Sequence, residues 1–507
     1  MAKKMIVIGA GPGGLAAAML LAGKGYDVEV YEKQTFVGGR NGAVTMDGYT
    51  FDIGPTFLSM PEIAEELFEA AGRNLHDYVD LQELSMMYEL IFKDKRVQIF
   101  KDPELLSEEI ERHYPGNAEG YTRFMNDTRK KMERLKPILQ SPMDRYYQYI
   151  SWKVLRALPQ LSLGKSLYSV LSDYFTDHEL RLAFTFQSKY LGMSPWECPG
   201  AFSILSFMEH EYGIFHPIGG VNQLSKAMAK VVTEHGGSIH LGRGVKKLWI
   251  EDRNVVKGII TEDGEQVSAD EVIINGDFAH VMSNLVEDGV LKKYSKEKLK
   301  KKKYSCSTFM IYLGIDKQFD LPHHSILFAE DYKKNVEEIT ETFTLPEDPS
   351  IYIQNASVTD KTLAPPGHST LYILAPVPNN VSGIDWTENE QMFRNLVLDA
   401  VESKTNLKNI REHIQVEKII SPHHWEVDFN IYQGATFNLG HQLTQMMALR
   451  PHNKFEELEN CWLVGGGTHP GSGLPTILES ARITTKMLLN EDPSYSFTKD
   501  QTMGEAL

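Results

Sequence analysis

The sequence predicts an α/β protein with a Rossmann-type parallel sheet and an inserted α+β unit. Three observations indicate this class: a strand–glycine turn–helix–strand unit at the N-terminus, a glycine-rich turn opening a helix near the C-terminus, and a long helical stretch between them. The 507 residues are 42% hydrophobic and 24% charged, globular values that exclude a disordered chain or a coiled-coil rod. At about 150 residues per domain the length suggests about three domains, and discontinuous segments would lower that number to two.

The N-terminal unit has the form of a nucleotide-binding turn. Residues 5–8 are a β-rich apolar run, GAGPGG makes the turn, a short helix ends near Gly25, and residues 28–33 read as a second strand. Gly9 allows the tight turn, Gly11 lets the backbone approach a pyrophosphate, and Gly14 lets the helix pack close to the strand. The predicted binding residues of this turn are Gly9, Ala10, Gly11, Pro12, Gly13 and Gly14. Glu32, at the end of the second strand, is expected to accept hydrogen bonds from an adenosine ribose.

The same N-terminal run, residues 5–23, is almost wholly apolar and follows Lys3 and Lys4, so it could also pass for a targeting or membrane segment. Its four glycines favour the nucleotide-binding turn instead, because a signal peptide has no need of them. No other window reaches about 20 uninterrupted apolar residues, and we expect no membrane-spanning helix.

Charge and cysteine content narrow the function further. The formal net charge of −16 argues against a nucleic-acid partner, since that affinity depends on Lys and Arg neutralising phosphates. Cys198, Cys306 and Cys461 show no paired spacing and are expected to be buried in a reducing compartment, with no metal site.

A second glycine motif indicates which dinucleotide binds. Residues 38–40, GGR, follow directly after the acidic strand end and are similar to the extended flavin fingerprint of amine oxidases, phytoene desaturases and related FAD proteins. Gly38 and Gly39 permit another close backbone approach, and Arg40 can place a guanidinium beside the pyrophosphate. The resemblance places the turn at residues 52–56 near the isoalloxazine of FAD.

The chain then reads as a discontinuous fold. Helical patterns dominate from about residue 85 to 214, followed by a helix at 221–234 and strands at 238–241, 245–250 and 255–261, with Gly264 in a hairpin turn. This part resembles the returning segment of an FAD domain, in which the Val245 backbone would contact the adenine; a plain β-meander is the alternative. Because no second GxGxxG unit appears, we expect dioxygen or a quinone, rather than NAD(P)H, as the electron partner.

The C-terminal segment 461–489 carries the most specific motif. An apolar strand enters the turn GGGTHPGSG, and Pro475 and Thr476 open a helix whose N-terminus would face the flavin or its ribityl chain. The segment resembles the C-terminal motif of bacterial carotenoid desaturases, in which Gly465 and Gly466 match positions that contact the FAD ribityl chain and pyrophosphate. Many amine oxidases carry an acidic residue where this chain has Gly466. His469 is a weak catalytic candidate, because a His beside a Pro-Gly turn can equally brace the loop.

Taken together, these motifs and the segments at 185–195, 304–316 and 348–367 resemble the bacterial carotenoid (phytoene) desaturase family, most closely its C30 branch, which acts on 4,4'-diapophytoene (dehydrosqualene). The resemblance implies an FAD-dependent oxidoreductase of carotenoid biosynthesis with a glutathione-reductase-like FAD domain from residues 1–85, 215–285 and 450–507. Residues 86–214 and 286–449 would form the substrate and membrane-associating domain. Terminal methyl oxidation of a C30 carotene, C40 phytoene desaturation and a non-enzymatic isoprenoid carrier of the same fold are the alternatives.

Such a reaction needs an apolar channel, hydride transfer to flavin and a modest base. The base candidates are Glu209, His210, Glu211, His423 and His424. The isoprenoid substrate dissolves in lipid, and residues 145–175 combine interfacial aromatics, spaced cations and apolar residues at helical intervals. We expect this segment either to lie on a membrane surface or to form a buried helical hairpin. The implied location is the cytoplasm, with peripheral association at the inner face of the cell membrane.

Overall fold

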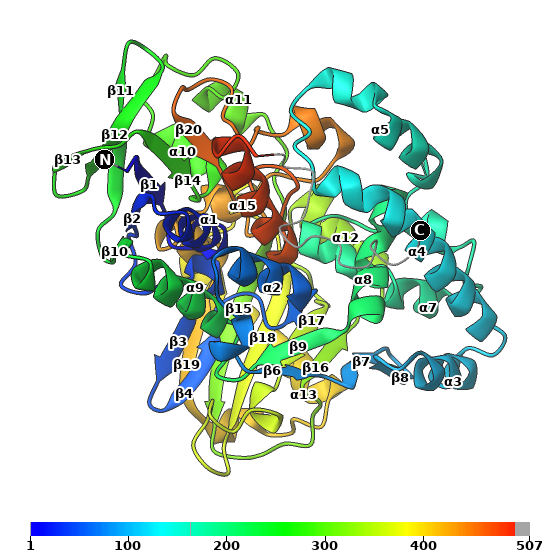
Figure 1. Ribbon diagram of the computed structural model, residues 1–507. Helices are drawn as coiled ribbons and strands as arrows, with labels where there is room; N and C mark the ends of the chain where they lie inside the picture. The colour runs from blue at the N-terminus through cyan, green and yellow to red at the C-terminus, as the bar shows by residue number, and fades with distance from the viewer. Residues whose placement is uncertain (1, 163, 492–507) are drawn as a thin grey trace.

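The computed structural model describes residues 2–162 and 164–491, and its first layer is a five-stranded parallel sheet in the order β10-β2-β1-β14-β20 (Figure 1). The strands are β1 (Lys4–Ile8), β2 (Asp27–Tyr31), β10 (Ser238–His240), β14 (Glu271–Ile274) and β20 (Cys461–Leu463). Every pairing is parallel. The sheet therefore joins N-terminal, middle and C-terminal segments, and it places the loops that follow these strands along one edge.

Both faces of this sheet are covered, which explains why β1 is apolar and buried after its first residue, Lys4. Helices α1 (Pro12–Gly23), α2 (Pro61–Ala70), α9 (Asn222–Glu234) and α15 (Leu474–Leu488) share one apolar core with it. The other face packs against the antiparallel strands β11 (Val245–Glu251), β12 (Val255–Thr261) and β13 (Gln266–Ser268), and against α10 (Phe278–Asn284) and α11 (Lys296–Lys300).

A seven-stranded sheet forms the second layer, in the order β19-β15-β18-β17-β16-β7-β8. Its strands are β7 (Met86–Ile91), β8 (Arg96–Phe100), β15 (Ser307–Ile315), β16 (His324–Leu327), β17 (Ile351–Gln354), β18 (Ser369–Val377) and β19 (Ile414–Ile420). All neighbours run antiparallel except β16 and β7. Helix α13 (Trp386–Lys404) covers one face through an apolar core that includes Trp386 and Phe393.

The prediction that helical structure begins near residue 85 is wrong for its first 15 residues, because β7 and β8 are strands of this sheet. β7 gains its place by pairing with β16, more than 200 residues further along the chain. Local periodicity carries no information about such a distant partner. The helical unit starts only at α3 (Pro103–His113), where the Asp102 side chain caps the helix by accepting from the amides of Glu104 and Leu105.

The remaining helices of this unit share a separate apolar core. They are α4 (Ala118–Leu139), α5 (Trp152–Ala157), α6 (Leu167–Leu171), α7 (His178–Ala183) and α8 (Ile204–Tyr212), and Figure 1 shows α5 at the periphery of the molecule. Short strands complete the fold: β3 (Ala43–Met46) with β4 (Tyr49–Asp52), and β5 (Leu58–Ser59) and β6 (Leu81–Glu83) on either side of β9 (Ile214–Pro217). Within the described ranges, no helix is both long enough and apolar enough to cross a bilayer.

Candidate active site

A cavity of about 510 Å³ lies between the two sheets, at the carboxyl ends of the parallel strands. Loops that follow β1, β2, β14 and β20 line one part of it, and side chains of the seven-stranded sheet and α8 line the other. In open parallel sheets this edge is where ligands bind. The motifs from both ends of the sequence thus meet at a single site.

The N-terminal glycine turn forms one wall of the cavity. Gly9 has φ +96°, in the left-handed region that favours glycine, and Gly11 lines the cavity as the residue before α1. A Cβ on Gly11 would lie 2.8 Å from Nδ2 of Asn275, which itself donates to the Gly9 carbonyl. A Cβ on Gly14 would collide with that same carbonyl. A side chain at Gly11 or Gly14 would meet these atoms. Because Gly11 has none, its backbone is open to a ligand in the cavity.

Not every predicted residue of this turn faces the cavity. Pro12 lines it, whereas Ala10, Gly13 and Gly14 do not. Gly13 instead packs between Asn275 and the Gly465 amide, at 2.7 Å and 3.1 Å from an added Cβ. The Ala10 amide instead donates a hydrogen bond to the carboxylate of Glu32.

Glu32 sits on the cavity wall with both carboxylate oxygens engaged. Oε2 accepts from the Ala10 amide at 2.7 Å and Oε1 accepts from the Gln34 amide at 2.8 Å. Burial raises the pKa of Glu32, and these amide hydrogen bonds act in the opposite direction. Each oxygen keeps a second lone pair, so the held carboxylate can still accept from a ligand hydroxyl.

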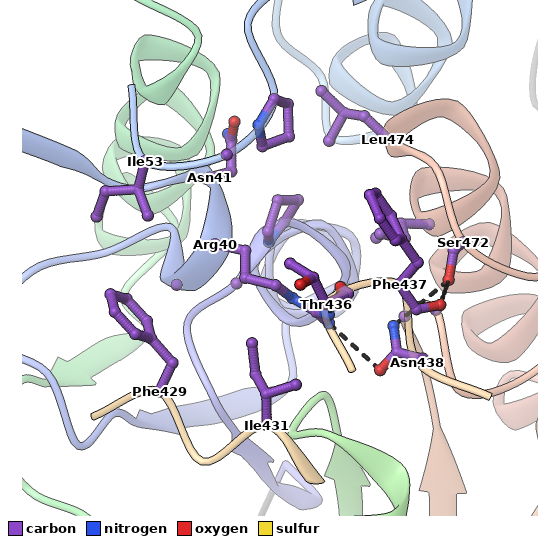
Figure 2. A pocket seen from close by; sticks show the side chains of 18 of the residues that line it. Arg40, Asn41, Ile53, Phe429, Ile431, Thr436, Phe437, Asn438, Ser472 and Leu474 are labelled. Carbon is purple, nitrogen blue, oxygen red and sulfur yellow. Dashed lines mark hydrogen bonds between the residues drawn. The ribbon is translucent and has the colours of Figure 1, made fainter. Parts of the chain in front are cut away.

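Arg40 supplies positive charge to the same cavity (Figure 2). Its Nη1 donates to the Thr436 carbonyl, and Nη2 to Oδ1 of Asn438. With its amide turned to satisfy both neighbours, Asn438 also donates to Asp277 at 2.8 Å. Burial lowers the pKa of Arg40, while Asp277 raises it. A partly buried guanidinium held by one carbonyl, one amide and a nearby carboxylate fits an anionic ligand, and Gly39 beside it also lines the cavity.

The C-terminal turn closes the site from the opposite direction. Gly465, Gly466 and the first residues of α15 line the cavity, and Leu474 points into it in Figure 2. The Gly465 amide donates to Ser480 Oγ at 2.8 Å, which ties the turn to the helix. Val245, predicted to contact an adenine, lines the cavity as well.

Arg450 braces this turn from behind and was missed by the sequence prediction. It is fully buried and donates to the carbonyls of Thr468 at 3.0 Å and Gly466 at 2.6 Å. Burial lowers the pKa of Arg450 to about 10. No sequence signal distinguishes this residue, because its acceptors are backbone atoms of a distant loop.

His469 lies within the braced turn, buried and outside the set of residues that line the cavity. Its carbonyl accepts from Asn453 at 3.1 Å, and burial followed by the charge of Arg450 lowers the pKa of its imidazole to about 4. Neither nitrogen of its buried imidazole has a hydrogen-bond partner among the described residues, so the catalytic and the loop-bracing role of His469 both stay predictions.

Of the five base candidates, only Glu209 lines the cavity. Its Oε2 accepts from Gln187 at 2.9 Å and from the Tyr88 hydroxyl at 3.3 Å. His210 is buried against Phe184 and bonds the Ser206 carbonyl, and Glu211 forms an ion pair with Arg129 at 2.7 Å. His423 and His424 lie at the start of α14 (Pro422–Val427), outside the lining.

Three tyrosines of the seven-stranded sheet hold the turn at residues 53–56. The Tyr312 hydroxyl donates to the Ile53 carbonyl at 2.7 Å, and the Tyr372 hydroxyl donates to the Gly54 carbonyl at 2.8 Å. The Tyr352 hydroxyl lies 2.5 Å from Thr56 Oγ1. Tyr352, Tyr372 and Thr56 line the cavity. The sequence offers one sign of these tyrosines, because each carries a hydroxyl within an otherwise mainly apolar run, IYLG, IYIQ or LYIL.

Beyond this turn the cavity wall is mainly apolar. The wall residues there include Phe186, Leu191, Leu205, Met208, Ile326, Phe328 and Tyr332. Lys189 is the cation of this part, with Nζ 4.5 Å from the Tyr332 ring centre, and burial lowers the pKa of Lys189 to about 7. The site therefore combines a polar half suited to a dinucleotide with an apolar half suited to a hydrocarbon.

Comparisons with known proteins agree with this geometry. Residues 12–486 match the family of flavin-containing amine oxidoreductases. A 4,4'-diapophytoene desaturase (4,4'-diapolycopene-forming) of Methylomonas sp. is 50% identical over 96% of this chain and 95% of its own length. A 4,4'-diapophytoene desaturase (4,4'-diaponeurosporene-forming) of Staphylococcus haemolyticus is 32% identical over 96% and 98%.

Solved structures share the fold at low sequence identity. An oxidoreductase from Methanosarcina mazei has a TM-score of 0.62 and 18% identity, covering 96% of this chain and 100% of its own. A putrescine oxidase bound to putrescine has a TM-score of 0.60 and 16% identity, covering 97% and 99%.

Proposed function

This chain belongs to the family of flavin-containing amine oxidoreductases, and on that premise we propose that it is an FAD-dependent desaturase of 4,4'-diapophytoene in carotenoid biosynthesis. The observation that carries the proposal is 50% identity over 96% of the chain to a 4,4'-diapophytoene desaturase. That relative is named for forming 4,4'-diapolycopene, so we propose repeated desaturation toward that product. The apolar half of the cavity supports a hydrocarbon substrate over an amine.

The polar half of the cavity fits FAD. Gly11 would leave room for the pyrophosphate, Arg40 would offer its positive charge, and Glu32 would accept from the adenosine ribose. Val245 would lie against the adenine, and Gly465 and Gly466 against the ribityl chain. When bound, FAD supplies the acceptor for the two electrons that leave an allylic C–H bond as a hydride.

The protein's own task is to align the polyene and exclude water. The apolar wall around Phe186, Met208 and Phe328 lets a hydrocarbon lie there without stripping water from polar groups. The aromatic side chains of Tyr332 and Tyr352 also line the cavity, and electron-rich rings tolerate a nearby positive charge. We propose dioxygen or a quinone as the final electron acceptor.

We also propose that the segment around α5 binds the inner face of the cell membrane peripherally, with the rest of the protein in the cytoplasm. Tyr146, Tyr147, Ile150 and Trp152 are 72%, 68%, 75% and 67% exposed. The Arg156 guanidinium lies 4.9 Å from the Trp152 ring centre, so a cation accompanies the apolar group. Exposed aromatics beside cations are typical of interfacial binding, and a substrate dissolved in lipid requires such contact.

A vesicle experiment tests the membrane proposal. The double substitution Ile150→Ser with Trp152→Ser should reduce co-flotation with vesicles of anionic phospholipid by at least about tenfold, because two large apolar groups no longer enter the bilayer. Val381→Ser is the matched control, since Val381 is 58% exposed but lies on another part of the chain, just before α13. Equal flotation of the double variant and the control would refute this docking surface.

Coexpression with a C30 squalene-type synthase tests the reaction. Cells that contain both proteins should turn from colourless to yellow or red as conjugation lengthens, and the purified protein should absorb as a flavoprotein. A gain of oxygen in the products would indicate terminal methyl oxidation instead. Unchanged substrate from protein with bound flavin would refute the proposed function.

A further inference from the structure

Among the three tyrosines that hold the turn at residues 53–56, Tyr352 has a histidine as a second hydrogen-bond partner of its hydroxyl. The hydroxyls of Tyr312 and Tyr372 end on backbone carbonyls, which cannot take up a proton. The Tyr352 hydroxyl lies 2.7 Å from Nδ1 of His324, and the two rings stack. Tyr352 therefore connects the cavity to a titratable group, and Tyr372 does not.

The chemistry of the proposed function, on which this inference rests, requires a proton acceptor at the cavity. Removal of a hydride from one carbon leaves an allylic cation, and the neighbouring carbon must then lose a proton. A C–H bond beside such a cation is strongly acidic, so a weak base in the right place is sufficient. Position, rather than basicity, decides which residue serves.

Position favours Tyr352 over the carboxylate of Glu209. Tyr352 bonds Thr56, in the turn expected beside the isoalloxazine, and the proton must leave a carbon adjacent to the hydride donor. The Glu209 carboxylate lies on α8 and already accepts from Gln187 and Tyr88.

We propose that Tyr352 is the proton acceptor of each desaturation and that His324 receives the phenol proton in the same event. The Thr56 hydroxyl donates to the Tyr352 oxygen, which leaves the phenol proton for Nδ1 of His324. The electron pair of the first C–H bond leaves with the hydride to the flavin, and that of the second forms the new C=C bond. The released proton binds the Tyr352 oxygen as the phenol proton moves to His324.

The surroundings keep both groups neutral before the reaction. Burial raises the pKa of Tyr352, and burial followed by the charge of His216 lowers the pKa of His324 to about 3. The His324 ring lies 4.3 Å from that of His323, whose Nδ1 is 2.8 Å from the hydroxyl of the partly exposed Thr359. Nε2 of His324 has no hydrogen-bond partner among the described residues, so the accepted proton is held on His324 itself.

Deuterium labelling separates proton removal from hydride removal. Tyr352→Phe should lower turnover by about 10²-fold, the ordinary contribution of a general base, with the FAD content of the purified protein unchanged. Deuterium at the proton-losing carbon should then give a larger isotope effect than in the wild type, and deuterium at the hydride carbon a smaller one. His324→Gln keeps an acceptor for the phenol but takes up no proton. Like Tyr352→Phe, it should raise the isotope effect at the proton-losing carbon and lower the one at the hydride carbon.

Tyr372→Phe is the matched control, because it removes a hydroxyl from the same turn without breaking a path to a histidine. Its isotope effects should equal those of the wild type. Wild-type isotope effects in Tyr352→Phe, or a shift in Glu209→Gln alone, would overturn the assignment of Tyr352. Absence of desaturation by the wild type would instead refute the proposed function, so the two failures are distinguishable.

Discussion

Replacing Gly11 tests the placement of the pyrophosphate. The φ of Gly11 is −75°, a value that any residue adopts, so a substitution there introduces no backbone strain. A Cβ would lie 2.8 Å from Nδ2 of Asn275 and 3.8 Å from the Gly38 carbonyl. Asn275 would have to withdraw by about half an ångström to restore van der Waals contact, which weakens its 3.2 Å hydrogen bond to the Gly9 carbonyl.

The expected cost follows from this geometry. The added methyl group would meet the bound ligand as well as Asn275, and overpacking of about 1–3 kcal/mol that falls on the complex corresponds to about 5-fold to about 150-fold in the Kd for FAD. Gly11→Ala should lie near the lower limit, and Gly11→Val should exceed the upper one because its methyl groups enter the space of the ligand. The flavin-to-protein absorbance ratio and titration of the apoprotein with FAD measure both variants.

Gly25→Asn is the matched control at the other end of α1. Gly25 has φ +83°, which Asn tolerates better than other side chains, and no heavy atom lies within 4 Å of the added Cβ. This variant should retain FAD as the wild type does. Wild-type affinity for FAD in Gly11→Val would refute the placement of the pyrophosphate beside Gly11.

Two further predictions concern charge. Arg40→Met keeps most of the apolar stem but removes the guanidinium, so the Kd for FAD should rise at least about tenfold and become less dependent on salt, as titration at two ionic strengths will show; equal salt dependence would contradict this. Asp360→Asn should lower the free energy of unfolding by about 1.5–3 kcal/mol near neutral pH, because Asp360 accepts from His216 at 3.1 Å and from the Gly219 amide. Burial would raise the pKa of Asp360, but these hydrogen bonds and those of Thr362 outweigh it and hold the pKa below its usual range. Its stabilisation is therefore complete above about pH 4 and fades as the pH falls below that value. Denaturant unfolding should show the two proteins converging in acid, and a constant difference would count against a stabilising Asp360 carboxylate.

The parts of the site that the sequence predicted are local. Gly9, Gly11, Glu32 and the C-terminal glycines line the cavity, since each motif encodes a strand end, a close backbone approach and a helix start within a few residues. Even there, the sequence could not tell that Ala10 acts through its amide on Glu32, whereas Gly11 faces the cavity.

The parts that the sequence did not predict depend on distant pairing. β7 is a strand because β16 lies beside it, and Tyr352 reaches the turn at residues 53–56 only through the seven-stranded sheet. The same limit applies to the base candidates. Glu209 and His210 are neighbours in the sequence, yet the helical turn of α8 directs one to the cavity and the other to Phe184.

The central claim is that this chain desaturates a C30 polyene precursor. Mass spectrometry of the products formed by the purified, FAD-loaded protein from 4,4'-diapophytoene in phospholipid vesicles tests it most directly. We expect a series of products in which each member has lost one more pair of hydrogen atoms, with no oxygen gained and with absorption moving to longer wavelength. Unchanged 4,4'-diapophytoene, or products that carry oxygen without any loss of hydrogen from the chain, would contradict it.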